Sequence, residues 1–332
     1  MKKLLIFFSL GVIALAFTIF WINPSELSLH FYNIEYFPLG LSVLFYLSSF
    51  FIRALRWKVL IKPLADKVSF RNLFWMVCIS LMVNVLLPLK IGEVVRAYLL
   101  KIREKVLFVE GLSSVIVERL LDILTLALIG IIGLNVIPEA LALPSWIHQG
   151  IRVTGLTVGG LMGFFILGLV KKDPLIVKLV SLLRFLKVPY RLVDRGTDIL
   201  NSMFKGASGL SISKVSQFQV SIMTLLIWLV HIGWIYFTFQ AFNINIALPA
   251  LILGFVIVTL GTLIPSPPGF LGTFEALWLT VFLALGSINI GRLLALILIA
   301  HLVNVGSIMV VGTLGLFFMG LSFGEVLKGS KG

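Results

Sequence analysis

The sequence predicts an all-α membrane protein that crosses the bilayer several times and carries two short helical hairpins that enter it only partway. Hydrophobic residues make up 59% of the chain and charged residues 12%, and the mean hydropathy is +1.11. Soluble domains carry about 25% charged residues. Several apolar runs reach the length of about 20 residues that a membrane-spanning helix needs. Two further apolar regions are interrupted by proline and glycine, which predicts broken helices.

The long apolar runs define the expected spans. We expect six full spans, at 4–22, 37–52, 112–137, 151–170, 220–240 and 293–319. The run at 4–22 follows two lysines and therefore also resembles a signal peptide. Its apolar part is longer than a usual signal core and more spans follow, so we interpret it as an uncleaved anchor.

The two interrupted regions, 72–101 and 248–286, each hold two shorter apolar arms around a break. The residues expected to form the hinges are Pro88 and Gly92 in the first break and Pro265, Pro267, Pro268 and Gly269 in the second. Within a bilayer, broken backbone is tolerated only where it is buried in protein or lines a wet cavity. Paired breaks in two halves of a membrane protein are typical of a transport site. The alternatives are ordinary loops, or arms that each cross the membrane.

Charges in the loops predict the orientation in the membrane. The segments 53–71 and 171–214 are rich in Lys and Arg, and 53–71 includes Arg53 and Arg56. The segments between the other expected span ends carry almost no basic residue. By the positive-inside rule, both termini face the cytoplasm and the protein lies in the cell membrane. The two hairpins then enter from opposite sides, as an inverted repeat would place them.

Ionisable residues inside the apolar regions mark the candidate site. Glu118, Arg119 and Asp122 share one expected helix, and Glu93 and Arg96 lie on the first hairpin. Residues three or four apart on a helix are neighbours and can pair. A charge near the middle of a bilayer costs at least about 3 kcal/mol, so such residues usually mark a pathway or a buried network. The alternative is an ion-pair cluster that only holds helices together.

The cations indicate the kind of substrate. Lys90, Arg96 and Arg119 are expected to neutralise an anionic headgroup, since Arg binds phosphate with two parallel hydrogen bonds. Short helices that begin after Pro88 or Pro268 would add N-terminal amides, which attract anions. For Lys90 the alternative is a side chain that reaches the interface. The carboxylates expected to orient the cations or exchange a proton are Glu93, Glu118, Asp122 and Glu275.

Other signals exclude several function classes. Cys78 is the only cysteine, so neither an internal disulfide nor a cysteine metal site is expected. No zinc, nucleotide or dinucleotide motif is present, and we expect no cofactor, no metal and no enzyme activity. The excess of basic residues behind the net charge of +13 lies in the segments where the positive-inside rule places it, which argues against nucleic-acid binding. The basic loop 171–219 is expected on the inner leaflet. We interpret His231 and His301 as hydrogen-bonded packing residues of the spans, and the alternative is that they line the cavity.

The broken regions and the charged helix contain three motifs that resemble those of a known family. The motifs Leu87-Pro88-x-x-x-Gly92-Glu93-x-x-Arg96, Val117-Glu118-Arg119-x-x-Asp122 and Ile264-Pro265-x-Pro267-x-Gly269-x-x-Gly272-x-x-Glu275 resemble the flippase-like family. That family includes the membrane domain of lysylphosphatidylglycerol synthetase/flippase proteins. The resemblance covers nearly the whole chain and implies one transmembrane domain over 1–332, with re-entrant hairpins around a cavity. No soluble synthetase domain follows the last span, so we expect a stand-alone member that does not synthesise lipid.

The resemblance also implies a function and partners. It implies translocation between leaflets of an anionic phospholipid, a glycolipid or a polyprenyl-phosphate-linked lipid. A glycosyltransferase or a lipid-synthesis enzyme is the expected protein partner, and the sequence leaves an oligomer open. Two alternatives stand beside transport. One is a membrane accessory that holds a glycosyltransferase without transporting, and the other is an intramembrane lipid-modifying enzyme with the carboxylates as acid and base.

Overall fold

A computed structural model describes residues 24–65, 68–87, 90–136, 213–262, 266–286 and 288–328, with isolated positions between 149 and 197. Within this part of the chain every regular element is a helix, which confirms the all-α prediction. The expected spans at 4–22 and 151–170, the basic loop 171–219 up to residue 212, and Pro88 and Pro265 lie outside the described residues, apart from isolated positions.

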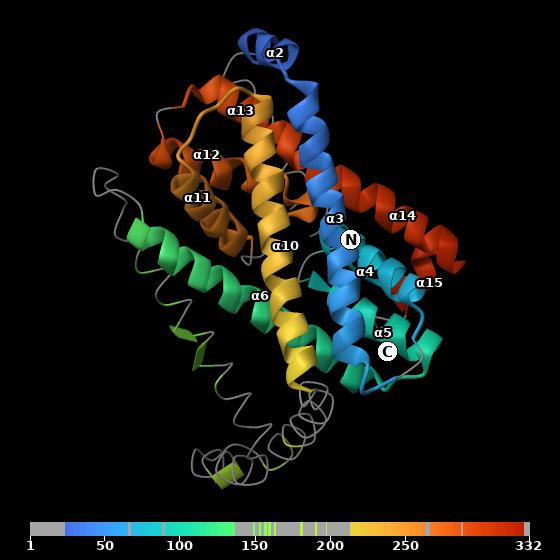
Figure 1. The fold of residues 1–332 in the computed structure, drawn as a ribbon. Coiled ribbons are helices and arrows are strands. Elements are labelled where there is room, and N and C mark those ends of the chain that lie inside the picture. Colours follow the sequence, from blue (N-terminus) through green and yellow to red (C-terminus); the bar gives the residue numbers. More distant parts are fainter. Residues whose placement is uncertain are drawn as a thin grey trace.

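Two long helices, α3 (Tyr36–Ile61) and α10 (Lys214–Ala241), pack side by side in opposite directions (Figure 1). Near the beginning of α3, the Ser42 hydroxyl lies 2.7 Å from that of Thr238, close to the end of α10. Near the end of α3, Arg56 donates to Thr224 at 3.1 Å, close to the beginning of α10. These two contacts fix the antiparallel register of the pair.

The order of elements recurs after each of these helices. In the first half α3 is followed by a short helix, a break, a second short helix and a long helix, namely α4 (Phe70–Leu86), α5 (Gly92–Glu104) and α6 (Phe108–Val136). In the second half α10 is followed by α11 (Leu248–Gly261), the 3₁₀ turn η3 (Pro268–Phe270), α12 (Thr273–Leu285), and a bent helix made of α13 (Ile290–His301), the π-helical segment η4 (Leu302–Gly306) and α14 (Ser307–Met319). Short helices α2 (Pro24–Tyr32) and α15 (Phe323–Lys328) flank the two halves.

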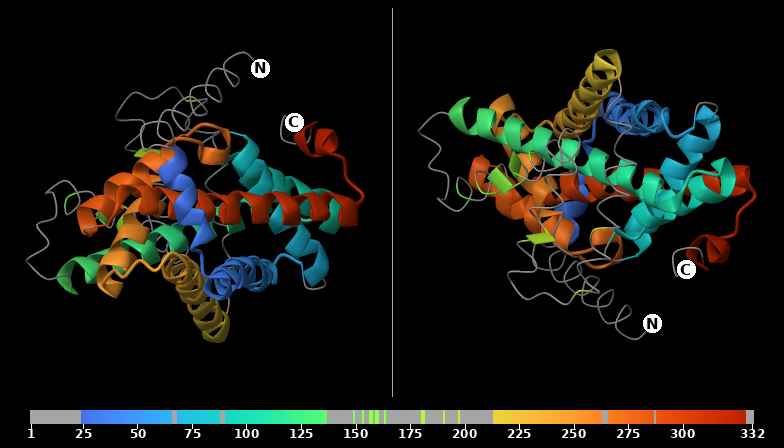
Figure 2. Two further views of the ribbon diagram at one scale, coloured as in Figure 1. Left: turned by 90° about the horizontal axis from the view of Figure 1, so that it is seen from above. Right: turned by 90° about the horizontal axis from the view of Figure 1, so that it is seen from below.

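The halves also pack on each other reciprocally. The first hairpin helix α4 packs against α14 of the second half, and α11 packs against α6 of the first half. Because α3 and α10 run in opposite directions, the hairpin α4–α5 lies toward one end of the molecule and α11–α12 toward the other (Figures 1 and 2). This is the arrangement that an inverted repeat produces.

The hairpin helices are short. They hold 17, 13, 14 and 13 residues, so at about 1.5 Å per residue none reaches the 30 Å of a bilayer's hydrocarbon core. Lys90 at the first break and Phe270 at the second line one central cavity. Both hairpins therefore end near the middle of the molecule.

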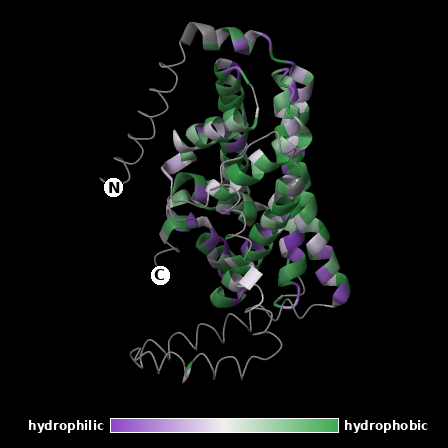
Figure 3. Cartoon of the chain, turned by 90° about the vertical axis from the view of Figure 1, so that its left-hand side faces the viewer, coloured by the Kyte–Doolittle hydropathy of each residue, from purple (hydrophilic) through white to green (hydrophobic). Residues whose placement is uncertain are grey.

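Among the described residues, three helices are long and apolar enough to cross a membrane, by length and composition: Tyr36–Ile61, Lys214–Ala241 and Ile290–Met319. They contain the expected spans at 37–52, 220–240 and 293–319. The expected span at 112–137 falls in α6, which has 29 residues and carries the charged motif. Large apolar side chains are exposed along these helices, as at Leu44, Phe51 and Phe317, and in Figure 3 most of the helical ribbon is coloured as hydrophobic. Such a surface is typical of contact with lipid.

Two expectations about element ends were wrong. The second span does not end at Ile52, because α3 continues to Ile61 and places Arg53 and Arg56 inside the bundle rather than in a cytoplasmic loop. The helix can continue because the guanidinium groups of Arg53 and Arg56 both pair with a carboxylate of α6. No helix of useful length follows Pro268 directly. Only the three-residue turn η3 forms there, and α12 begins at Thr273.

Candidate functional site: a charged cavity between the hairpins

A cavity of about 230 Å³ lies where the two breaks meet. Its polar wall comes from the first half of the chain and includes Arg53, Asn84, Lys90, Glu93, Arg119 and Asp122. Its aromatic wall comes mainly from the second half, with Tyr46 of α3 beside Trp228, Trp234, Phe255, Phe274 and Trp278. The cavity therefore offers charges on one side and ring faces on the other.

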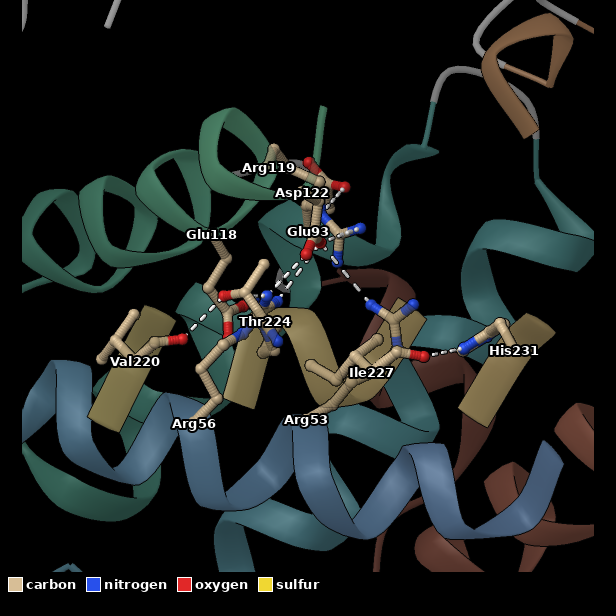
Figure 4. Close-up of polar contacts among 11 residues, drawn as sticks. Arg53, Arg56, Glu93, Glu118, Arg119, Asp122, Val220, Thr224, Ile227 and His231 are labelled. Carbon is tan, nitrogen blue, oxygen red and sulfur yellow. Dashed lines mark hydrogen bonds and ion pairs between the residues drawn. The ribbon is translucent and has the colours of Figure 1, made fainter. Parts of the chain in front are cut away.

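Asp122 is the centre of the charged network (Figure 4). Arg56 binds it with two bonds, from Nη1 to Oδ1 at 2.5 Å and from Nη2 to Oδ2 at 3.2 Å. Arg119 Nη1 and Arg53 Nη1 lie 3.3 and 3.7 Å from Oδ2. Thr224 supports Arg56 from α10, accepting from Nη1 while its own hydroxyl donates to the Val220 carbonyl at 2.8 Å. One carboxylate of α6 thus gathers three arginines from two helices.

Glu118 lies one helical turn before Asp122 and is fully buried. Arg96 of α5 donates to its Oε2, and Arg56 Nε lies 3.4 Å from its Oε1. The guanidinium of Arg96 also stacks over the Trp57 ring, 4.5 Å from the ring centre. Because buried charges are tolerated only when they are paired, these contacts join α3, α5 and α6 into one unit behind the cavity wall.

The ion pair at the edge of the cavity is more exposed than the pairs behind the cavity wall. Glu93 Oε1 lies 2.9 Å from Arg119 Nε, and the two side chains are 21% and 29% exposed. Lys90 also lines the cavity, and among the described residues no carboxylate oxygen comes within 4.0 Å of its ammonium group. Lys90 has a left-handed backbone with φ of 53°, which is uncommon for a residue other than glycine. Its charge is therefore available to the cavity.

The network as a whole carries an excess of positive charge. Five cations face three carboxylates, namely Arg53, Arg56, Lys90, Arg96 and Arg119 against Glu93, Glu118 and Asp122. Net attraction for an anion of one or two charges follows from this imbalance, and the surrounding apolar helices strengthen it by excluding water.

The first break is closed by close backbone packing. Gly92 begins α5, and a β-carbon at this position would lie 1.9 Å from the Ser80 carbonyl oxygen of α4. The Gly92 amide donates to Asn84 Oδ1 at 2.8 Å. The N-terminal amide of α5 predicted to meet a substrate is therefore already bound by a side chain of the same hairpin.

The second break is held by a different set of contacts. Glu275 of α12 accepts from the Gly272 amide at 2.8 Å through Oε2 and lies 2.5 Å from His301 Nδ1 through Oε1. The other nitrogen of His301, Nε2, lies 2.7 Å from the Gly269 carbonyl oxygen. Gly269 and Gly272 have φ of 71° and 75°, which glycine adopts without strain. One histidine thus ties the break to the bent helix.

The structure places the predicted site residues in four locations. Lys90, Glu93, Arg119 and Asp122 line the cavity, and Arg96 and Glu118 lie behind its wall. Glu275 lies apart from the cations, and among the described residues its only ion-pair partner is His301. Gly92, Pro267, Pro268 and Gly269 lie at the breaks. That these residues bind a substrate stays a prediction.

The sequence did not predict the contribution of four residues to the site and the two breaks. Arg53 and Arg56 were assigned to a loop, although their spacing of three residues on an apolar helix matched that of Arg119 and Asp122. Asn84 lies in the first motif, but its bond to Gly92 depends on the hairpin fold. His301 was interpreted as a packing residue, and it bonds to both Glu275 and the break.

The helical repeat, the apolar surface and the charged internal cavity define a polytopic membrane protein. Residues 6–312 match the family model described as lysylphosphatidylglycerol synthase TM region, so the chain belongs to that family. This agrees with the resemblance inferred from the three motifs.

Three curated relatives support the same placement. Two are described as UPF0104 membrane proteins of Methanothermobacter thermautotrophicus. One is 26% identical over 84% of this chain and 83% of its own length, and the other is 25% identical over 96% of both. The third, described as glycosyltransferase AglD of Haloferax volcanii, is 24% identical over 92% of this chain. The match covers 52% of AglD, so the present chain spans about half of that relative. No solved structure matches the chain.

Proposed function

We propose that this protein translocates a lipid with an anionic headgroup between the two leaflets, as a transporter rather than an enzyme. The observation that carries the proposal is the excess positive charge of a cavity enclosed by two half-length hairpins. A headgroup would bind there while its acyl or prenyl tails stay in the surrounding lipid. The family membership supports a lipid-related role. An anionic phospholipid and a polyprenyl-phosphate-linked lipid present the required charge, as does a glycolipid whose headgroup is anionic.

Lys90 is the residue on which this proposal depends most directly. It lines the cavity with no carboxylate partner in the part of the chain that the structure describes, whereas Arg119 also holds Glu93 and Asp122 in place. The aromatic wall supports the glycosylated candidates, because Trp and Tyr rings offer apolar faces that pack against a sugar ring. Arg53 lies 5.9 Å from the centre of the Trp228 ring, so charge and ring face adjoin at one point of the cavity.

The proposal includes an orientation in the cell membrane. Lys58 and Lys62 at the end of α3 lie beside Ser216 and Gln219 at the beginning of α10. Lys214 begins α10, and Lys101 and Arg103 end α5. Since basic residues gather at cytoplasmic loops, this end faces the cytoplasm, and the hairpin α4–α5 enters from that side.

Native mass spectrometry of co-purifying lipids tests the proposal. We expect wild type to retain an anionic or phosphate-linked lipid and Lys90→Gln to retain at least about tenfold less, which corresponds to about 1.4 kcal/mol of lost affinity. Lys101→Gln is the matched control, since Lys101 is exposed on the same hairpin. Equal thermal stability of the three proteins is the condition for comparison. The same lipid complement in wild type and Lys90→Gln would contradict a headgroup site at this cavity.

A second candidate function is a non-transporting accessory of a glycosyltransferase or a lipid-modifying enzyme. The match to about half of AglD favours it, because a related membrane region belongs there to a longer protein described as a glycosyltransferase. Under this alternative, cavity variants that fold would keep the activity of the partner enzyme. Lipid loss in Lys90→Gln together with lost function in cells would exclude it.

A further inference from the structure

The contacts of His301 require one proton more than a neutral imidazole and an ionised carboxylate together carry. Its Nε2 lies 2.7 Å from the Gly269 carbonyl oxygen, and a carbonyl oxygen only accepts, so Nε2 must carry a hydrogen and donate it. Its Nδ1 lies 2.5 Å from Glu275 Oε1. A neutral imidazole has one hydrogen, which Nε2 already uses, and an ionised carboxylate has none.

A second proton must therefore lie between Nδ1 and Oε1. Either an imidazolium donates to a carboxylate, or a carboxylic acid donates to a neutral imidazole, and the pair holds the same number of protons in both forms. If one of the two protons leaves, the remaining hydrogen of the imidazole can serve Glu275 or the Gly269 carbonyl but not both. Two lone pairs then face each other at one of the two contacts, and that contact must separate. The remaining acceptor role of Glu275 toward the Gly272 amide does not depend on this proton.

The position of the pair gives its protonation a structural effect. His301 is the last residue of α13, directly before the π-helical segment Leu302–Gly306, and it lines the cavity. Its ring stacks on Phe274, with ring centres 4.5 Å apart. Through Gly269 and Glu275 it connects both sides of the second break to the bent helix. A π-helical segment often marks a functional site and lets a helix bend there.

We propose that Glu275 and His301 form a proton-binding site that latches the second hairpin to the bent helix. With the proton bound, the break at 266–272 is held against α13. When the proton passes from the pair to water in the cavity, the contact separates and the break is free to move. This rests on the proposed function and adds to it a proton as the coupled ligand.

The first half of the chain holds an ion pair in a position equivalent to that of Glu275 and His301, but with different chemistry. Arg96 of α5 bonds to Glu118 of α6, as Glu275 of α12 bonds to His301 of α13. Each pair joins the second arm of a hairpin to the next long helix. Arginine stays charged at every accessible pH, so the first pair keeps its cation, whereas histidine is the type of side chain that can change its charge. The repeat thus combines a fixed hairpin with a switchable one.

Other titratable groups face the same cavity as His301. They are His231 from α10, Tyr46 and Arg53 from α3, Lys90 at the first break, Glu93 from α5, and Arg119 and Asp122 from α6. His30 of α2 lies at the other end of α13, beside Gly291. Of the elements packed on the pair, α11 and η4 carry no titratable side chain. Within the described residues, none of these groups lies within 4.0 Å of His301 or Glu275 as an ion-pair partner.

The test measures access to the break as the pH changes. In a Cys78→Ala background, the labelling rate of Leu271→Cys reports how accessible the break is. Lys101→Cys in a second protein is an exposed reference, and dividing by its labelling rate removes the effect of pH on the reactivity of the thiol itself. In nanodiscs, we expect the ratio of the two labelling rates to rise with pH, by up to about tenfold per pH unit because one proton is released. A constant ratio in protein with the pair intact would overturn the latch.

Substitutions then assign the proton to this pair. Glu275→Gln keeps all three hydrogen bonds, since its amide donates to Nδ1 and its oxygen accepts from Gly272, so the break should stay closed at every pH. His301→Ala should label fast at every pH. Glu325→Gln is the matched control, because Glu325 also accepts from an amide three residues earlier, that of Ser322 at 2.7 Å, and it should follow the wild type.

An unchanged pH profile in Glu275→Gln would place the proton elsewhere and overturn the assignment. The labelling experiment uses no lipid substrate, so it can fail while wild type still retains an anionic lipid that Lys90→Gln loses. The converse result, a working latch without lipid retention, would reject the proposed function alone.

Discussion

At the residue scale, the ion pairs of the cavity differ in how much of the fold depends on them. Glu118 is fully buried and lies between Arg56 and Arg96, and both of these arginines are buried as well. Removing its charge leaves Arg96 without an ion-pair partner among the described residues and leaves Arg56 with Asp122 alone, in a medium that solvates cations poorly. Such a loss costs about 3–5 kcal/mol, whereas a partly exposed pair contributes about 1 kcal/mol or less.

We therefore expect Glu118→Gln to lower the free energy of unfolding by about 3 kcal/mol and Glu93→Gln by less than about 1 kcal/mol. Glu93 is the matched comparison, because it is the same residue type in an ion pair at the edge of the same cavity. Unfolding in one detergent, followed by circular dichroism, measures both. Equal losses in the two variants would mean that the network around Glu118 is not the buried, water-free cluster described above.

At the element scale, the first hairpin depends on the absence of a side chain at Gly92. A β-carbon there would lie 1.9 Å from the Ser80 carbonyl oxygen and 2.7 Å from Asn84 Oδ1. Backbone cannot yield as a flexible side chain does, so α4 and α5 would have to separate. We expect Gly92→Ala to destabilise the protein by at least about 1–3 kcal/mol, the usual range for overpacking.

The control for this substitution is Gly40→Ala in α3, where nothing lies within 4 Å of the added carbon. Alanine favours helix over glycine by up to about 1 kcal/mol, so Gly40→Ala should leave stability unchanged or raise it. Thermal unfolding of both variants in the same detergent measures the contrast. If Gly92→Ala unfolds at the wild-type temperature, the close contact of α4 and α5 at this position is wrong.

Sequence patterns predicted the elements better than the contacts between them. The hairpins were predictable because Pro88, Gly92 and the residues around Pro267 interrupt apolar arms too short to span a bilayer. The pairing of Arg119 with Asp122 followed from helical spacing. Arg56 with Asp122 and His301 with Glu275 did not, because these partners are far apart in the chain and meet only through the packing of α3 on α6 and of α12 on α13.

At the scale of the whole molecule, the inverted arrangement explains why one cavity can form between two unlike walls. The hairpins lie toward opposite ends of the molecule and both breaks reach one cavity, so each contributes its break to a common space. The Lys, Arg, Asp and Glu side chains of the cavity then belong to one repeat and most of its aromatic side chains to the other. Under the proposed function, movement of one hairpin against the other would open the cavity toward one leaflet at a time, as alternating access requires.

The depth of the two breaks is a prediction that can be measured in a bilayer. Lys90 and Phe270 line one cavity of about 230 Å³, so spin labels on Ile91→Cys and Leu271→Cys in a Cys78→Ala protein should lie well within about 30 Å of each other, the thickness of the hydrocarbon core. If each arm instead crossed the membrane, the two breaks would reach opposite surfaces and the labels would be separated by at least that thickness. Double electron–electron resonance in nanodiscs distinguishes the two distances. A pair on Lys62→Cys and Asn243→Cys, at the far ends of the antiparallel helices α3 and α10, is the matched control and should give the longer distance in either case.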